Sequence, residues 1–211
     1  MSITVRITAS ALAGAARLLT GVRPNWVGCL PEPRQRIYLA NHTSHGDFVL
    51  IWTVLPQALR ARTRPVAAAE YWSRGKLRRF VGQDVFKAVL IAREGVNRSN
   101  DPRAPLLAAL DAGNSLILFP EGTRNTTDAK LLPFKSGLFH VARARPDVEL
   151  VPVWIDNLSR VMPKGELLPI PLLCNVTFGA PLQISPQEPK TVFLERARQA
   201  LMSLAPRSSE S

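Results

Sequence analysis

Short apolar runs alternate with longer amphipathic segments along most of this chain. Short apolar runs between polar or proline residues are typical of buried strands, and longer runs with a helical period are typical of helices. The pattern predicts strands over 35–40, 65–69, 89–92, 115–119, 150–155 and 174–178. It predicts helices over 47–55, 71–86, 102–112, 136–145 and 191–204. Asp101 is a candidate cap for the helix that follows it, with Pro102 at the first helical position.

The order of these segments favours an α/β fold. Strands alternate with helices, and the strands are apolar enough to be covered on both faces. We therefore predict a single domain over 25–205, with a mixed sheet flanked by helices. The Pro-rich stretch 24–34 is expected to connect the first helix to this domain, and 206–211 to form a frayed tail.

Residues 1–24 are predicted to form an amphipathic helix. At about 100° per residue, its polar side holds Ser2, Arg6, Ser10, Arg17 and Thr20. Its apolar side holds Ile7, Ala11, Ala15, Leu18, Leu19 and Val22. The two arginines leave the segment short of the roughly 20 apolar residues that span a membrane. The helix could lie in a membrane interface or pack on the domain's own core, and the sequence leaves both open.

The net charge of +11 implies an anionic partner. A nucleic acid, an anionic membrane and an acidic carrier protein would all fit. No helix-turn-helix, ribonucleoprotein or zinc-finger pattern is present, so nucleic-acid binding is the alternative outside enzymes rather than the prediction. Two basic clusters suit a membrane surface or a carrier protein, or are ordinary solvated faces: Arg60, Arg62 and Arg64, and then Arg74, Lys76, Arg78 and Arg79 beside Tyr71, Trp72 and Phe80.

The first candidate for chemistry is the motif Asn41-His42-Thr43-Ser44-His45-Gly46-Asp47. On one continuous helix, His42 and Asp47 would point about 140° apart. They can meet only if His42 lies in the loop before a helix and Asp47 in its first turn. Asp47 would then accept a hydrogen bond from Nδ1 and leave Nε2 as a base. The alternative is that Asp47 or Ser44 only caps the helix.

The same motif allows two other interpretations. His42, His45 and Asp47 could be metal ligands, but no second ligand cluster accompanies them and the remaining histidine is His140, so no metal is predicted. Ser44 lacks the G-x-S-x-G elbow of serine nucleophiles. The sequence therefore favours a histidine base.

The second candidate is the motif Phe119-Pro120-Glu121-Gly122-Thr123-Arg124. Gly122 permits a tight turn, and Arg124 suits an anionic group. Both motifs directly follow predicted strands. Functional loops of open α/β sheets gather at strand ends, so the two motifs could converge.

These motifs resemble the signature blocks of the glycerolipid acyltransferases. His42 and Asp47 are similar to the family's H-x4-D pair, and 119–124 looks like its second block. Ile91-Ala92-Arg93-Glu94-Gly95 resembles the intervening arginine block, although Ala92 stands where an aspartate often precedes the arginine. Val151-Pro152-Val153 is similar to the later apolar-proline block. The blocks follow the family's order over roughly 36–180, as in bacterial 1-acylglycerol-3-phosphate acyltransferases.

The resemblance implies transfer of a fatty acyl group from a thioester to a glycerol-backbone hydroxyl. His42 would be the general base and Asp47 its orienting partner, with no acyl-enzyme and no cofactor. Main-chain N–H groups near the first motif would hold the oxyanion. The donor would be acyl-CoA or acyl carrier protein. The acceptor would be lysophosphatidate, which gives phosphatidate at the cytoplasmic face of the inner membrane.

The resemblance also implies a substrate site. Its residues would be Arg93, Glu121, Gly122, Thr123, Arg124 and Lys135. The arginines would bind the acceptor phosphate, unless they pair with Glu94 and Glu121. Glu121 would hold the turn or Arg124, or contact acceptor hydroxyls. Ile51, Trp52, Val54 and Leu55 could line an acyl channel or be ordinary core.

Two other reactions would use the same chemistry. One is acylation of another acceptor: a lyso-ornithine lipid, another lysophospholipid or glycerol 3-phosphate. The other is hydrolysis, with water in place of the acceptor.

Overall fold

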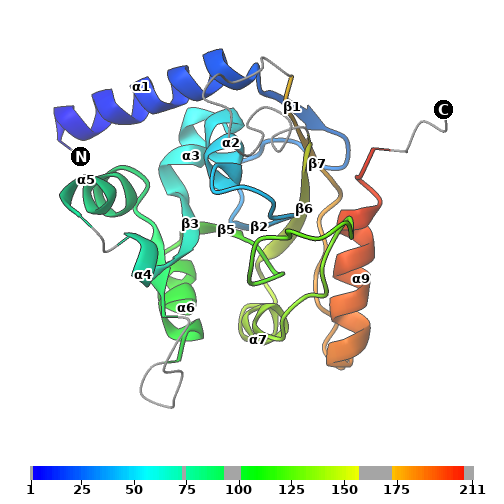
Figure 1. Ribbon diagram of the computed structural model, residues 1–211. Helices are drawn as coiled ribbons and strands as arrows, with labels where there is room; N and C mark the ends of the chain where they lie inside the picture. The colour runs from blue at the N-terminus through cyan, green and yellow to red at the C-terminus, as the bar shows by residue number, and fades with distance from the viewer. Residues whose placement is uncertain (1, 73–74, 93–100, 157–172, 207–211) are drawn as a thin grey trace.

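A mixed sheet forms the centre of the molecule (Figure 1). The computed structural model describes residues 2–72, 75–92, 101–156 and 173–206. Within them, seven strands lie in the order β1-β7-β6-β2-β5-β3-β4. Their bounds are β1 Arg23–Trp26, β2 Arg36–Ala40, β3 Thr63–Ala68, β4 Val89–Ile91, β5 Ser115–Leu118, β6 Glu149–Asp156 and β7 Asn175–Phe178. Neighbouring strands in this sheet pair in parallel, except that β6 and β7 are antiparallel.

Helices cover both faces of the sheet, as the apolar strands predict. The helical segments are α1 Ile3–Thr20, α2 Asp47–Val54, α3 Gln57–Arg62, α4 Ala69–Trp72, α5 Lys76–Arg79, the π-helix η1 Phe80–Val85, α6 Arg103–Asp111, α7 Gly137–Ala144 and α9 Lys190–Met202. Tyr38 and Ala40 of β2 belong to a core cluster with α2, whereas Ile37 and Leu39 belong to a second cluster with α6, α7 and α9. The predicted α/β fold with a mixed sheet is confirmed.

The six predicted strands are present, but the expectation that 24–34 only connects is wrong. Its first residues form β1, which pairs with β7 from Arg23 to Trp26. The segment Arg-Pro-Asn-Trp has no apolar alternation, so its sequence gives no strand signal. At the edge of the sheet, Pro24 is tolerated because an edge strand can dispense with one N–H donor.

The predicted helix over 71–86 is also wrong. It is replaced by α4, α5 and η1, and Gly75 has a φ of 83°, which does not continue a helix. At Gly82 in η1, an added Cβ would lie 2.5 Å from the Trp72 ring, so the close packing of the two segments requires glycine.

The short helix α3 carried no periodic signal. In α6, Asp101 accepts from the Arg103 main-chain N–H at 2.9 Å, although the helix begins one residue later than predicted.

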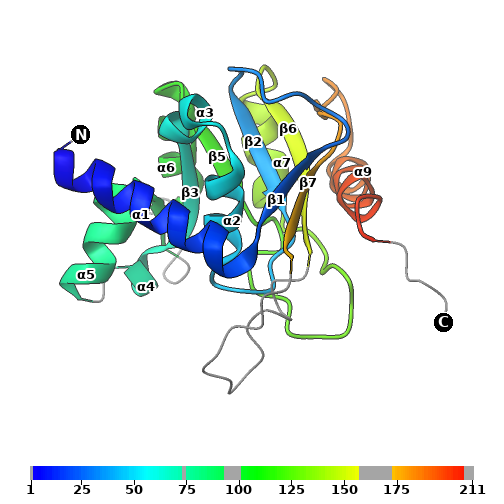
Figure 2. The same ribbon diagram turned by 90° about the horizontal axis from the view of Figure 1, so that it is seen from above.

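The N-terminal helix α1 lies across the molecule beside α2 (Figure 2). It packs with Val5, Ala13 and Thr20, while Ile3, Ile7 and Leu18 are 76%, 64% and 85% exposed. The helix therefore turns most of its predicted apolar side away from the domain and packs with the opposite side. Within the described residues, no helix is long and apolar enough to cross a membrane.

The central strands position the two motifs. β2 pairs in parallel with β5 on one side and β6 on the other, so β2 and β5 end at the same edge of the sheet. The first motif follows β2, and the second follows β5. The fold thereby brings together segments 79 residues apart in sequence, as the His42–Glu121 hydrogen bond shows.

The contact between β1 and β7 gives a prediction for stability. A Cβ at Gly28 would lie 2.0 Å from the Ala180 main-chain nitrogen and 2.4 Å from the Gly179 carbonyl carbon. Because neither backbone atom can move cheaply, we expect Gly28→Ala to lower the free energy of unfolding by about 3 kcal/mol in urea titrations. The matched variant Gly14→Ala in α1 meets no atom within 4 Å and should stabilise by about 0.5–1 kcal/mol. Equal stability of Gly28→Ala and the wild type would contradict this packing.

Candidate active site

Buried side chains fasten the two motif loops to the sheet. The Asn41 amide donates to the Ile155 carbonyl at 3.0 Å and accepts from the Ile155 N–H at 2.8 Å, which anchors the end of β2 to β6. The Asn125 N–H donates to the His42 carbonyl at 2.7 Å and ties the second loop to the first. The first motif is therefore held from both neighbouring strands. The sequence offered no clear signal for the Asn41 contact, since an asparagine after a strand reads as a turn residue.

His42 and Asp47 meet as the spacing requires. His42 lies in the loop and Asp47 in the first turn of α2, with 2.9 Å between His42 Nδ1 and Asp47 Oδ2. An ionised carboxylate only accepts, so Nδ1 carries the hydrogen and Nε2 is left as an acceptor. The imidazole also stacks on Phe119, with ring centroids 4.1 Å apart and planes 19° apart. Two contacts therefore fix the orientation of this ring.

The alternative that Asp47 only caps the helix is wrong. Its Oδ2 also accepts from the main-chain N–H groups of Thr43 and Ser44, at 2.7 and 2.9 Å, which precede the helix. No side chain caps α2, whose N-cap residue is Gly46. The carboxylate is buried, and its charge is directed at the loop that carries His42. Three donors on one oxygen hold Asp47 and shape the loop around it.

Glu121 accepts hydrogen bonds from the main chain of the loops around it. It is 1% exposed, and its two oxygens accept from the main-chain N–H groups of His42 at 2.8 Å and Leu132 at 2.9 Å. Burial raises the pKa of the Glu121 carboxyl, and the two N–H donors oppose this effect. Glu121 is buried and each of its oxygens accepts one main-chain hydrogen bond, so its contact with an acceptor hydroxyl stays a prediction. These two bonds agree with the alternative that Glu121 holds the chain around the turn.

The rest of the second motif forms an exposed turn. Gly122 has a φ of 73°, and its N–H donates to the Phe119 carbonyl at 3.1 Å. A Cβ on Gly122 would lie 3.0 Å from Lys135 Cγ, so glycine lets Lys135 lie against the turn. None of the ion pairs within the described residues involves Arg124 or Lys135. The proposed pairing of Arg124 with Glu121 is therefore wrong.

A cavity of about 640 Å³ joins these residues. His42, Gly122, Thr123, Arg124 and Lys135 line it together with His45. Burial and the nearby Arg124 charge lower the pKa of His45, which favours its neutral form. Among the described residues, no three His, Cys, Asp or Glu side chains are grouped to hold a metal ion. Arg93 lies outside the described residues.

The remaining walls of the cavity are largely apolar. They come from Val66, Ala67 and Ala68 of β3, Ile91 of β4, Phe48 of α2 and Trp72 of α4. Sequence reasoning missed these residues, because strand and helix side chains that line a cavity have the same pattern as ordinary core. The residues suggested for an acyl channel lie elsewhere: Ile51, Val54 and Leu55 are buried core, and Trp52 borders a different cavity.

This arrangement can perform a defined kind of chemistry. The cavity combines an oriented imidazole, two cations without acidic partners in the described part of the chain, and an apolar wall. It suits an amphiphilic anion whose hydroxyl loses a proton to His42.

Known proteins resemble this chain in sequence and in fold. The family model described as Acyltransferase matches residues 29–156. A protein named 1-acyl-sn-glycerol-3-phosphate acyltransferase from Cocos nucifera is 30% identical, over 74% of this chain and 48% of its own length. A protein of the same name from Haemophilus influenzae is also 30% identical, over 56% of this chain and 46% of its own length. The chain thus spans about half the length of the curated relatives it matches.

The fold also has a counterpart among solved structures. The 1-acyl-sn-glycerophosphate (LPA) acyltransferase PlsC from Thermotoga maritima matches with a TM-score of 0.69. The match covers 96% of this chain and 80% of that one, at 22% identity. At this identity the match establishes the fold.

Glu121 gives a prediction for stability against pH. Its raised pKa means that the folded state favours the protonated form, so its contribution to stability is lost as pH rises through the folded pKa. We expect the melting temperature of the wild type to fall relative to that of Glu121→Gln, which cannot titrate, between mildly acidic and neutral pH. Melting curves of both proteins by circular dichroism measure this difference. Parallel curves at every pH would contradict the effect of burial.

Proposed function

Because the chain belongs to the Acyltransferase family, we propose that it transfers a fatty acyl group from a thioester to the sn-2 hydroxyl of 1-acylglycerol 3-phosphate, giving phosphatidate. The observation that carries this proposal is the shared cavity of His42, Arg124 and Lys135. A base and two cations there face one space, as a substrate with a reactive hydroxyl and a phosphate requires. The names of the relatives support the same substrate.

His42 is the proposed general base. Its Nε2 takes the proton of the acceptor hydroxyl as the oxygen attacks the thioester carbonyl. A C–O bond forms, the C–S bond breaks, and the thiolate leaves with the proton from the imidazolium. Asp47 holds the ring at Nδ1 and stabilises its charged form through the 2.9 Å contact. No acyl-enzyme is required in this direct transfer.

The oxyanion formed during attack requires positive partial charge. Helix α2 begins at Asp47, five residues after His42, so the positive end of its dipole lies beside the base. Main-chain N–H groups at this end of α2 are our proposed source of stabilisation.

Arg124 and Lys135 are the proposed partners of the acceptor phosphate. A guanidinium group binds phosphate through two parallel hydrogen bonds, and an ammonium group adds a point charge. The Gly122 turn places Lys135 against the arginine loop. Thr123 adds a polar side chain to the same wall of the cavity. Arg93, from the intervening block, is proposed to join them.

The apolar wall formed by β3, β4, Phe48 and Trp72 is the proposed place of the acyl chain. Burial of methylene groups there would contribute about 0.8 kcal/mol each. The donor is acyl-CoA or acyl carrier protein, and parallel assays with both thioesters identify it.

We also propose that α1 attaches the protein to an anionic membrane surface, at its cytoplasmic face. Ile3, Ile7 and Leu18 are exposed on one side of a helix that packs on the domain with its other side. An interfacial helix buries its apolar side chains at the boundary between lipid headgroups and acyl chains. The net charge of +11 supports an anionic surface.

The proposed base gives the first test of this function. We expect His42→Ala and Asp47→Asn to lower the turnover of labelled acyl-CoA or acyl carrier protein with 1-acylglycerol 3-phosphate by about 10²–10⁴-fold, because the base is removed or misoriented. His140→Ala, an exposed histidine outside the cavity, is the matched control and should retain full activity. Phosphatidate formation that persists in His42→Ala would rule out this base, and release of free fatty acid alone would indicate a hydrolase.

The phosphate partners give a second test. Loss of a charged hydrogen bond costs about 1.5–3 kcal/mol, so Arg124→Gln should lower kcat/KM for lysophosphatidate by about 10–100-fold. Most of the change should be in KM, and activity toward monoacylglycerol, which lacks the phosphate, should not change. Arg143→Gln, an exposed arginine on α7, controls for net charge. A wild type that acylates monoacylglycerol or lyso-ornithine lipid in preference to lysophosphatidate would point to a different acceptor.

A further inference from the structure

A second cavity lies between α1, α3 and η1, apart from the candidate active site. Its volume is about 400 Å³. Its residues are Arg6, Ala9, Ser10, Trp52, Gln57, Arg60, Ala61, Arg64, Val85 and Lys87. It shares none of these with the cavity of His42. Arg64 lies at the start of β3, whereas Ala68 at the other end of this strand borders the active-site cavity, so the two cavities occupy opposite edges of the sheet.

The charge of this second cavity is entirely positive. Arg6, Arg60, Arg64 and Lys87 line it, and no carboxylate is among its described lining residues. None of the ion pairs in the described part of the chain involves any of these four side chains. Arg60 and Arg64 donate to main-chain carbonyl oxygens, which offset part of this charge. The remaining grouping of like charges would be relieved by a bound anion.

Arg60 is built into this cavity. It donates to the carbonyl groups of Thr53 and Leu55 at the end of α2, at 3.3 and 3.1 Å, and its guanidinium lies 4.9 Å from the centre of the Trp52 ring. Arg17 of α1 donates to the same Thr53 carbonyl at 3.1 Å. Burial lowers the pKa of Arg60, and the Arg17 charge adds to this effect. The Arg60 Nε atom is buried without a hydrogen-bond partner in the described structure.

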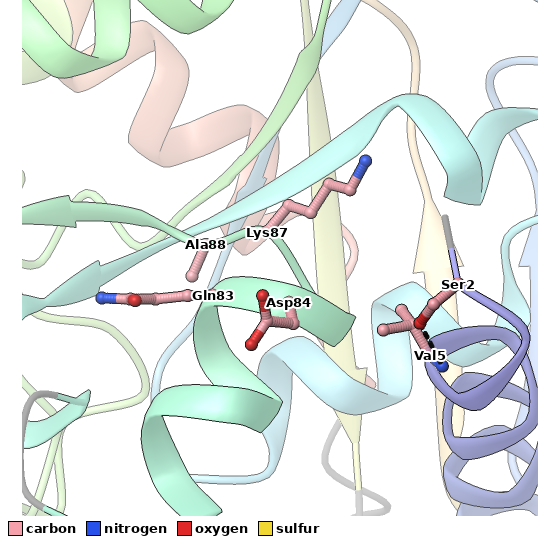
Figure 3. Close-up of a pocket in the computed structure, with 6 residues that line it drawn as sticks. All are labelled: Ser2, Val5, Gln83, Asp84, Lys87 and Ala88. Carbon is pink, nitrogen blue, oxygen red and sulfur yellow. Dashed lines mark hydrogen bonds between the residues drawn. The ribbon is translucent and has the colours of Figure 1, made fainter. Parts of the chain in front are cut away.

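Lys87 is placed in this cavity by an uncommon backbone conformation. It follows η1 with a φ of 50°, and the Ala88 N–H donates to the Gly82 carbonyl at 2.8 Å. A helix end of this kind normally has glycine at the left-handed position, so lysine there is strained. The closest acidic neighbour in sequence is Asp84. Lys87 and Asp84 both border an adjoining hollow, where Lys87 extends away from the Asp84 carboxylate (Figure 3).

We propose that this cavity binds the phosphate group of an anionic phospholipid headgroup. Guanidinium and ammonium groups are the side chains that bind phosphate. The cavity borders α1 at Arg6, between Ile3 and Ile7, whose side chains are exposed. A lipid whose acyl chains contact this apolar row would present its headgroup at the depth of Arg6. The proposal rests on the membrane attachment proposed above, but not on the acyl-transfer chemistry.

The test compares two pairs of substitutions that remove equal charge. Arg6→Gln with Lys87→Gly empties the cavity of two cations, and glycine suits the φ of residue 87. The control pair, Arg23→Gln with Lys76→Gln, removes two exposed cations that lie outside the cavity. Arg23 follows α1, and Lys76 lies in α5, which continues into η1. Sedimentation of the full chain with phosphatidylglycerol–phosphatidylcholine vesicles measures the partition coefficient. We expect the cavity pair to lower it about tenfold more than the control pair, as one to two lost phosphate contacts imply.

Each other outcome overturns the proposal in a distinguishable way. Equal losses for both pairs would mean that attraction to the membrane is general rather than local. A wild type that binds no vesicle would refute membrane attachment as well, while leaving the acyl-transfer assay of His42→Ala to judge the chemistry. The single variants Arg6→Gln and Lys87→Gly give the same comparison if the pair is poorly folded.

A thermal shift with inorganic phosphate distinguishes the source of the phosphate group. Sodium chloride of equal ionic strength is its control, since any ligand that binds the native state raises the melting temperature. Protection of the wild type but not of the cavity pair, together with equal vesicle binding, would indicate a soluble phosphate and overturn the lipid headgroup.

Discussion

The candidate site depends on buried carboxylates that accept main-chain hydrogen bonds from loops. Glu121 bonds the N–H groups of His42 and Leu132, and Asp47 bonds those of Thr43 and Ser44. Loops lack the regular main-chain hydrogen bonds of helices and sheets, so their buried N–H groups need acceptors such as these carboxylates. These bonds offset part of the cost of burying the two carboxylates, although Asp47 Oδ1 is buried without a hydrogen-bond partner in the described structure. Without these bonds, His42 would sit on a loop with many conformations.

The same contacts separate a buried side chain from an exposed one within the second motif. Glu121 and Arg124 are three residues apart, yet the glutamate is buried and the arginine is exposed to the cavity. The turn at Gly122 reverses the direction of the chain between them. In the first motif, a single Asp47 oxygen both holds the loop and contacts the imidazole. Rigid support of this kind is what a positioned base requires.

Positive charge is arranged at two edges of the sheet, with different surroundings. Arg124 and Lys135 line the same cavity as His42, at the edge where β2 and β5 end. Arg6, Arg60, Arg64 and Lys87 lie at the other edge, under α1. The net charge of +11 by itself suggests only an anionic partner. Its division between the cavity of His42 and a helix with an exposed apolar side is a property of the fold.

By itself the sequence determined the fold class and the six apolar strands, because hydrophobic period is a local signal. It limited the contact of His42 with Asp47 to one arrangement but left helix capping as an alternative. Only the tertiary structure decided which side of α1 packs inward, since its small residues fit against α2 and leave Ile7 and Leu18 exposed. It also decided that Arg-Pro-Asn-Trp becomes β1, through pairing with a strand about 150 residues away. The burial of Glu121 and the cavity wall formed by β3 also depend on contacts between residues that are distant in sequence. Such contacts leave no periodic pattern in a single sequence.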